Sequence, residues 1–147
     1  MKRQEIITEL IYRLKEIKVS NGYLSDAGAN VYEWLQRPLT QGDDLPAIIL
    51  RDTDDNVEQG SYNATHKLKI EIDVVASHKE LTIEHLREVV SDVIKNIGQT
   101  CEGESDESLN LTCVYQGSEI HAEHAERLFG GARLTFVIQY ESDKWSA

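Results

Sequence analysis

The stretch from His66 to Val75, HKLKIEIDVV, restricts the fold more than any other part of the chain. Apolar and charged residues alternate along it, and the apolar positions are Leu68, Ile70, Ile72 and Val74. Because successive side chains of a strand point to opposite faces, this alternation predicts an antiparallel strand with one face on the core and the other in solvent. The fold should therefore contain a sheet that is covered on one face.

Other segments have the amphipathic pattern of helices that could cover this face. Residues 3–18 carry apolar side chains at helical spacing, and Ser20-Asn21-Gly22 favours a helix end after them. A second apolar stripe runs through residues 86–97. Ser77-His78-Lys79-Glu80 has the spacing of a capping box before this stripe, and Gly98 stands where the helix would stop.

Further segments predict strands, because they are rich in β-branched and aromatic residues; these are residues 29–36, 47–50, 108–115 and 132–141. The polar segments 52–65, 99–108 and 117–131 predict loops, with Gly130-Gly131 making a turn or bulge. Sequential strands without a helix between them usually pair antiparallel. We expect one α+β domain over residues 1–147, with a mostly antiparallel or mixed sheet of about five strands and two amphipathic helices packed on one face.

The charge balance bears on possible partners. The chain has 26 Asp and Glu against 15 Lys and Arg, and its formal net charge is −11. Specific binding to nucleic acid needs a basic face, and an anionic membrane surface would also repel this chain. The two cysteines, Cys101 and Cys113, have no metal-binding spacing and form no disulfide framework. We expect reduced thiols, with Cys113 buried and inert.

Acidic residues raise the question of a metal site. Asp52-x-Asp54-x-Asn56 begins like a calcium loop, but Val57 and Asn63 stand where such a loop needs Gly and Glu. A solvated acidic loop and a weak cation site are both open interpretations. A nuclease with paired metals is a further one, and its ligands would come from Asp52, Asp54, Asp55, Glu71 and Asp73. Their order matches no nuclease pattern.

Other catalytic patterns are weak or missing in the sequence. His121 and His124 could share one face of a helical turn and bind a metal, or could lie in a solvated loop; zinc usually takes at least three protein ligands. The glycines match neither a dinucleotide-binding nor a P-loop spacing, and no G-x-S-x-G motif occurs. The sequence therefore predicts a protein that is not an enzyme and has no cofactor.

Three segments taken in order resemble the tail terminator family of long-tailed phages. They are GYLSDAGANVYEWLQRPLTQGDDLPAIIL, HKLKIEIDVVASHKELTIEHLREVVSDVIKNI and GGARLTFVIQYES. The shared features are acidic residues before Pro-Ala and a strand, then an alternating strand with a helix, and then a closing strand. The segments 52–65, 99–107 and 116–131 match poorly.

The resemblance implies a structural protein of the virion, made in the cytoplasm of a bacterial host. Such proteins form a homo-hexameric ring at the head-proximal end of the tail tube, stop its polymerisation and present the surface that joins the head. The partners implied are the tail tube protein, the head–tail connector proteins and DNA that passes without specific binding. No catalysis, cofactor, metal or membrane contact is implied.

Two candidate surfaces follow from this interpretation. The first is a subunit or tube interface formed by Tyr32, Trp34, Arg37, Asp43 and Asp44, although both aromatic residues could instead belong to an ordinary core. The second is an acidic loop that is mobile in the free chain or faces the lumen of the ring, where it would repel DNA; its residues are Asp52, Asp54, Asp55 and Glu58.

The composition and pattern leave other functions open. One is another head–tail joining or tail-completion protein. A second is a small acidic enzyme that uses a divalent metal, and a third is a binding module of the host.

Overall fold

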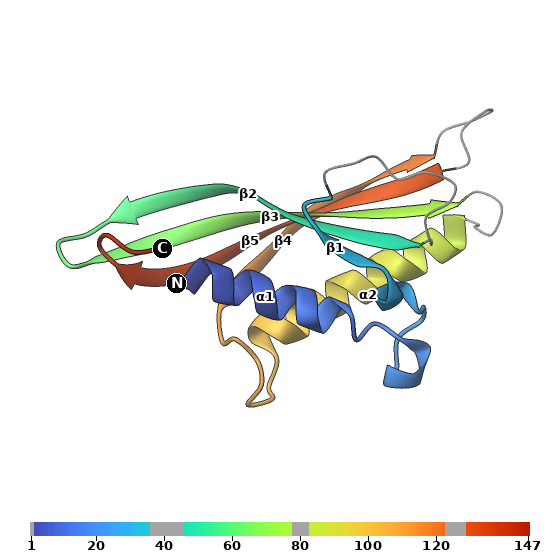
Figure 1. Ribbon diagram of the computed structural model, residues 1–147, viewed down its shortest axis with the longest axis horizontal. Coiled ribbons are helices and arrows are strands. Elements are labelled where there is room, and N and C mark those ends of the chain that lie inside the picture. The colour runs from blue at the N-terminus through green and yellow to red at the C-terminus, as the bar shows by residue number, and fades with distance from the viewer. Residues whose placement is uncertain (1, 36–45, 78–82, 123–128) are drawn as a thin grey trace.

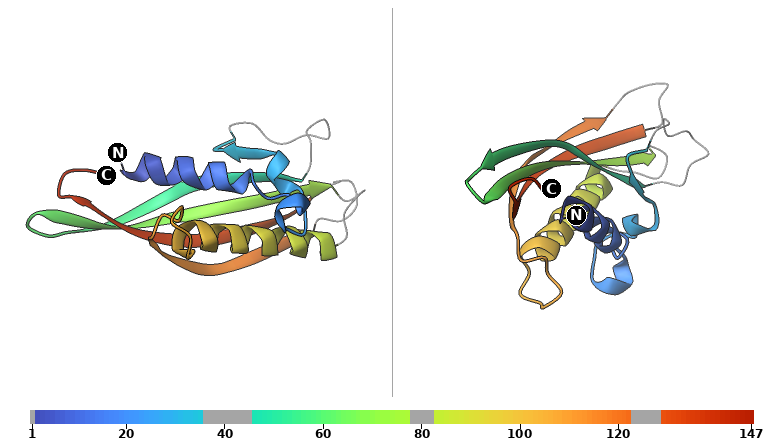
Figure 2. Two further views of the ribbon diagram at one scale, coloured as in Figure 1. Left: turned by 90° about the horizontal axis from the view of Figure 1, so that it is seen from below. Right: turned by 60° about the vertical axis from the view of Figure 1, so that its left-hand side comes forward.

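The computed structural model describes residues 2–35, 46–77, 83–122 and 129–147. In this part of the chain one five-stranded mixed sheet carries both long helices on the same face (Figures 1 and 2). The helices are α1 (Lys2–Leu14) and α2 (Ile83–Glu102). The α+β class with two helices on one face is therefore confirmed.

The strands are ordered β1-β2-β3-β5-β4 in the sheet. The pairs β2–β3, β3–β5 and β4–β5 are antiparallel, whereas β1 and β2 are parallel. The bounds are Val31–Glu33 for β1, Ala47–Gln59 for β2, Asn63–Ser77 for β3, Thr112–Ala122 for β4 and Phe129–Asp143 for β5.

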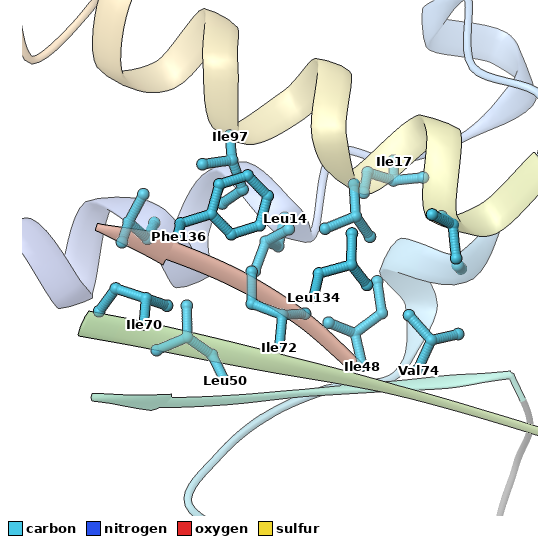
Figure 3. Close-up of a cluster of buried hydrophobic side chains, with 14 of the residues drawn as sticks. Leu14, Ile17, Ile48, Leu50, Ile70, Ile72, Val74, Ile97, Leu134 and Phe136 are labelled. Carbon is cyan, nitrogen blue, oxygen red and sulfur yellow. The ribbon is translucent and has the colours of Figure 1, made fainter. Parts of the chain in front are cut away.

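The alternating stretch forms the centre of the core. Leu68, Ile70, Ile72 and Val74 are at most 1% exposed, and they point from β3 toward the helices. Figure 3 shows Ile70, Ile72 and Val74 on the same side of the sheet as Leu14 and Ile97, which come from the two helices. Full burial of one such side chain stabilises the fold by about 1.5–3 kcal/mol. The predicted covered face is confirmed.

The first strand differs from the prediction. β1 has only three residues, and Val31 lies opposite Ile48 in a parallel register. Parallel neighbours need a connection of roughly a dozen residues or more, and residues 34–46 provide one. The expected antiparallel pairing of these two strands is therefore wrong, because a long connection removes the geometric demand that a short hairpin imposes.

Both helix ends lie at other residues than predicted. α1 ends at Leu14, and the Ser20-Asn21-Gly22 signal ends a short 3-10 helix (Val19–Asn21) instead, with Gly22 at a φ of 90°. α2 continues through Gly98 to Glu102. One glycine costs a helix about 1 kcal/mol, which burial of Cys101 in the last turn can offset. Most of the predicted capping box lies outside the described residues.

Much of two predicted loops is strand. Residues 52–59 belong to β2, residues 117–122 belong to β4, and Gly130-Gly131 lie inside β5. The β2 segment has no visible periodicity in the sequence because a bulge between Asp52 and Asp54 adds one residue and shifts the alternation. The third predicted loop, 99–108, begins with the last turn of α2.

Candidate functional site

The β2–β3 hairpin extends past the N-terminal end of α1, and both chain termini lie beside its base (Figures 1 and 2). Here the inward face of the sheet carries polar side chains. We call Arg3, Trp34, Asp52, Asp55, His66 and Ser142 the polar cluster. The bulge places Asp52 opposite Ile70 and Asp55 opposite Leu68, so both carboxylates face the same side as the core.

Asp52 joins α1, β1 and β2. Its carboxylate accepts hydrogen bonds from Arg3 Nε at 2.8 Å and from the indole Nε1 of Trp34 at 2.6 Å. Trp34 follows β1 with a φ of 49°, and its backbone N–H donates to the carbonyl of Leu50 at 3.0 Å. Burial raises the pKa of Asp52. The hydrogen bonds from Trp34 and Arg3 and the charge of Arg3 lower this pKa by more, so the net shift is downward.

Asp55, His66 and Ser142 form a second chain of contacts. His66 Nδ1 lies 2.8 Å from Asp55 Oδ2, and His66 Nε2 lies 2.8 Å from Ser142 Oγ. The His66 ring is 3% exposed and stacks on Tyr140 with 4.4 Å between ring centroids. Burial and the negative charge of Asp55 raise the pKa of Tyr140. These contacts connect β2, β3 and β5 across the hairpin end of the sheet.

Asp55, His66 and Ser142 contact one another in the same order as the acid, histidine and serine of a serine hydrolase, but this serine is bound differently. Ser142 Oγ also lies 2.8 Å from the carbonyl oxygen of Ser146 and 3.0 Å from that of Asp143, and it can donate its hydrogen to one of them. A hydroxyl has one hydrogen, and carbonyl oxygens only accept. Ser142 therefore ties the C-terminal residues to the hairpin.

The C-terminal residues lie along the hairpin and border an open groove of about 990 Å³. Lys144 N donates to the carbonyl of Tyr62 at 3.1 Å, and Gln59 Nε2 donates to the carbonyl of Lys144 at 2.8 Å. Large apolar side chains are exposed here: Tyr62 at 90%, Trp145 at 84% and Val57 at 48%. We call these three residues the tip patch.

A second exposed apolar surface lies on β4, an edge strand of the sheet. Val114, Ile120 and Tyr115 are 53%, 42% and 40% exposed. Tyr115 and Ile120 lie opposite the buried Phe136 and Ala132 on the helix-covered face, whereas Val114 lies opposite Val137 on the other face. We call these three residues along the strand edge the β4 patch. Tyr115 directly faces Phe136 across the strands and packs against it on the inward face, with 5.2 Å between ring centroids, and a bulge follows between Tyr115 and Gly117.

The structure brings the two predicted surfaces together at one point. Trp34 is 44% exposed and bonds Asp52, so one residue of the predicted interface touches one of the acidic set. Tyr32 is half-buried in β1. Arg37, Asp43 and Asp44 lie outside the described residues.

The acidic set lies in a strand and not in the loop that the sequence predicts, while its mobility and its position relative to a lumen stay predictions. All four residues belong to β2: Asp52 and Asp55 point inward to partners, and Asp54 and Glu58 are exposed on the opposite face. Because Asp52 and Asp54 lie on different faces, they cannot act as ligands of one calcium loop. The carboxylates of Asp52 and Asp55 already accept hydrogen bonds from cationic or neutral donors, which leaves them less in need of a metal ion to balance their charge.

The acids of the nuclease interpretation are likewise divided between two faces. Glu71 and Asp73 lie on the face opposite the helices, where Arg51 Nη2 contacts them at 2.9 and 3.1 Å. Arg133 Nε contacts Asp73 at 2.8 Å. Across the described ranges, no group of three or more His, Cys, Asp or Glu side chains is arranged to hold a metal ion. His121 lies in β4 and His124 lies outside the described residues.

Sequence reasoning missed Arg3, His66 and Ser142, although two of them carry a signal. His66 continues the inward phase of Leu68, and Ser142 continues the inward phase of Tyr140. A polar residue at an inward position needs a buried partner, because burial without a hydrogen bond is costly. Arg3 offers no such signal, since it lies on the first turn of a helix.

Comparison of the sequence with protein-family models and with curated proteins found no match. In the described part of the chain, neither helix is long and apolar enough to span a lipid bilayer.

Proposed function

We propose that this chain is a virion structural protein of the tail terminator type. In this proposal six copies form a ring on the head-proximal end of a phage tail tube, stop its polymerisation and join it to the head. The sequence resemblance supports the identity of the particle. The structural observation that carries the proposal is the presence of two unlike exposed apolar surfaces on one small domain.

A closed ring of identical subunits with head-to-tail contacts needs two different, complementary surfaces on each copy. The tip patch and the β4 patch meet this requirement. The tip patch takes Val57 and Tyr62 from the β2–β3 hairpin and Trp145 from the C-terminal residues, whereas the β4 patch belongs to an edge strand. Figure 1 shows this hairpin extending past the helices. In our proposal the tip patch of one copy packs on the β4 patch of the next. Aromatic residues such as Tyr62 and Trp145 are the kind that carry binding energy at interfaces.

The charge supports a role beside DNA that must move freely. The chain has a formal net charge of −11, and Asp54 and Glu58 are exposed on the face opposite the helices. Such carboxylates repel phosphates over about one Debye length of roughly 8–10 Å. Passing DNA, the tail tube protein and head–tail connector proteins are the proposed partners.

A substitution at Trp34 tests whether this residue belongs to an interface or to the core. Its 44% exposure favours the interface, whereas its bond to Asp52 gives it a structural role as well. We expect Trp34→Ala to weaken ring assembly more than it lowers the melting temperature. Tyr62→Ala is the matched variant, because this 90% exposed side chain should affect assembly alone. A large loss of thermal stability with unchanged assembly would instead assign Trp34 to the core.

Native mass spectrometry over a concentration series tests the proposed function, with the chain alone and with purified tail tubes. We expect a six-copy species that forms alone at high concentration or on the tube end. A single-copy species under both conditions would contradict the proposal. Electron microscopy of antibody-labelled particles then separates the tube end from the head connector, where a head–tail joining protein would bind.

A further inference from the structure

The chain's two cysteines, Cys101 and Cys113, lie side by side at the junction of α2 and β4. Cys101 is in the last turn of α2 and is fully buried, while Cys113 is the second residue of β4 and is partly exposed. Both are free thiols that contact the hydrophobic core. Cys113 packs against the buried cluster to which Cys101 belongs, and each thiol shifts the pKa of the other.

The backbone holds the two residues in this relation. The N–H of Leu111 donates to the carbonyl of Cys101 at 2.9 Å, and the N–H of Leu109 donates to the carbonyl of Thr100 at 2.7 Å. The N–H of Cys113 donates to Glu102 Oε1 at 3.1 Å. These bonds hold residues 109–113 along the last turn of the helix, beside Cys101.

The two thiols differ in reactivity. The neighbouring Cys101 thiol lowers the pKa of Cys113, although burial opposes this shift. The Cys113 thiol and burial raise the pKa of Cys101. Because the thiolate is the nucleophile, the partly exposed Cys113 is the attacking group and the buried Cys101 is the group that completes the bond.

We propose that Cys101 and Cys113 form a site of reversible oxidation, at which a disulfide ties the C-terminal end of α2 to the start of β4. The oxidant is a small disulfide such as oxidised glutathione. The Cys113 thiolate attacks one of its sulfurs, the sulfur–sulfur bond breaks, and one glutathione thiolate leaves. Cys101 then gives its proton to solvent and attacks the Cys113 sulfur, and the second glutathione leaves. Two protein thiols are oxidised, and one glutathione disulfide is reduced to two glutathione molecules.

The bond would fit the path of a virion protein. Thiols stay reduced in the cytosol, and disulfides persist in the oxidising surroundings of a released particle. Closing the loop from 101 to 113 restricts the unfolded chain and so stabilises the folded one. This timing rests on the proposed function, whereas the oxidation itself can be measured on a single copy of the chain and would remain if no ring formed.

The test is to incubate the folded, reduced chain with oxidised glutathione and measure its intact mass and its peptides under non-reducing conditions. We expect a loss of two hydrogen atoms, a peptide pair linked through Cys101 and Cys113, and a melting temperature several degrees higher than that of the reduced chain. Cys101→Ser should instead accumulate one glutathione on Cys113, and Cys113→Ser should stay unmodified because the remaining thiol is buried.

Two results would overturn the proposal. One is a wild-type chain that keeps both thiols or carries a stable glutathione adduct. The other is a disulfide between two copies of the chain. If Cys101→Ser fails to fold, the Cys113→Ser variant and the wild-type peptide map still decide the question, because Cys113 is partly exposed.

Discussion

The strands β2 and β3 have two ends that are built in different ways. At the end beneath the helices, their inward side chains are apolar and buried, as at Ile48, Leu50 and Ile72. Beyond the bulge, the inward positions of the same strands hold Asp55 and His66, which are joined by a hydrogen bond of 2.8 Å. The alternation of inward and outward residues is common to both ends, and the chemistry changes at the bulge.

The two ends should therefore differ in how much they stabilise the fold and in how readily they open to a partner. Apolar burial stabilises in proportion to the area removed from water, about 25 cal/mol per Å². A hydrogen-bonded pair adds only about 0.5–1.5 kcal/mol net, because it exchanges bonds with water. The core end should therefore set the global stability, whereas the hairpin end can open locally and accept a partner.

The largest effect should come from Leu50→Ala in the core end of β2. Leu50 is 0% exposed, so its truncation leaves a cavity and lowers the free energy of unfolding by about 2–5 kcal/mol. Val57→Ala in the same strand is the matched control; at 48% exposure it should change stability by less than about 0.5 kcal/mol. Urea denaturation measures both. Equal losses would mean that the two ends do not differ as described.

The next effect concerns the polar cluster. Asp55→Ala removes the partner of His66 Nδ1 and should lower the free energy of unfolding by about 1–3 kcal/mol. Asp54→Ala is its control, because this exposed neighbour points to the other face. A double-mutant cycle with His66→Ala isolates the pair. If Asp54→Ala costs as much as Asp55→Ala, the assignment of the two carboxylates to opposite faces is wrong.

Acid should weaken the hairpin end through Asp52. Its pKa is lower in the folded chain than the ordinary 3.8, so its stabilisation is complete above 3.8 and is lost as the pH falls through the lowered folded value. We expect unfolding free energies measured between about pH 5 and pH 2 to fall less steeply in Asp52→Asn than in the wild type. Identical slopes would show that Asp52 is no better stabilised when folded than when unfolded.

The smallest effect should be a gain in stability from a substitution in α2, which covers the core end. Gly98 lies inside α2, and a methyl group added there would meet no atom within 4 Å. Gly98→Ala should therefore raise the free energy of unfolding by about 0.5–1 kcal/mol, with no change in the hydrogen exchange of the hairpin. A destabilised variant would instead support the sequence prediction that the helix ends at this glycine.

The sequence predicted the parts of the fold that repeat a simple period. The alternation around Ile70 and the helical stripe around Val93 each describe one surface, and both surfaces are buried. The acidic half of β2 escaped prediction because a bulge adds one residue and removes the visible period. Exposed, charged strands also lack the apolar positions that reveal a period in the sequence.

The candidate site was less predictable than the fold because its contacts join distant segments. Arg3 and Asp52 lie 49 positions apart, and His66 and Ser142 lie 76 apart. Such contacts arise only after the strands have paired. Only His66 and Ser142 gave a local sign, since each continues the inward phase of a buried set along its strand. The role of Trp34 and the tip patch in assembly stays a prediction.

The most direct test is hydrogen exchange on the single-copy fraction and on the six-copy fraction, prepared with tail tubes where the ring needs them. The proposal predicts slower exchange of the amides around Val57 and Tyr62 in the ring, while those around Ile72 exchange slowly in both fractions. Equal exchange of the hairpin in the two fractions, or no six-copy fraction with tubes present, would contradict a ring formed through the hairpin end.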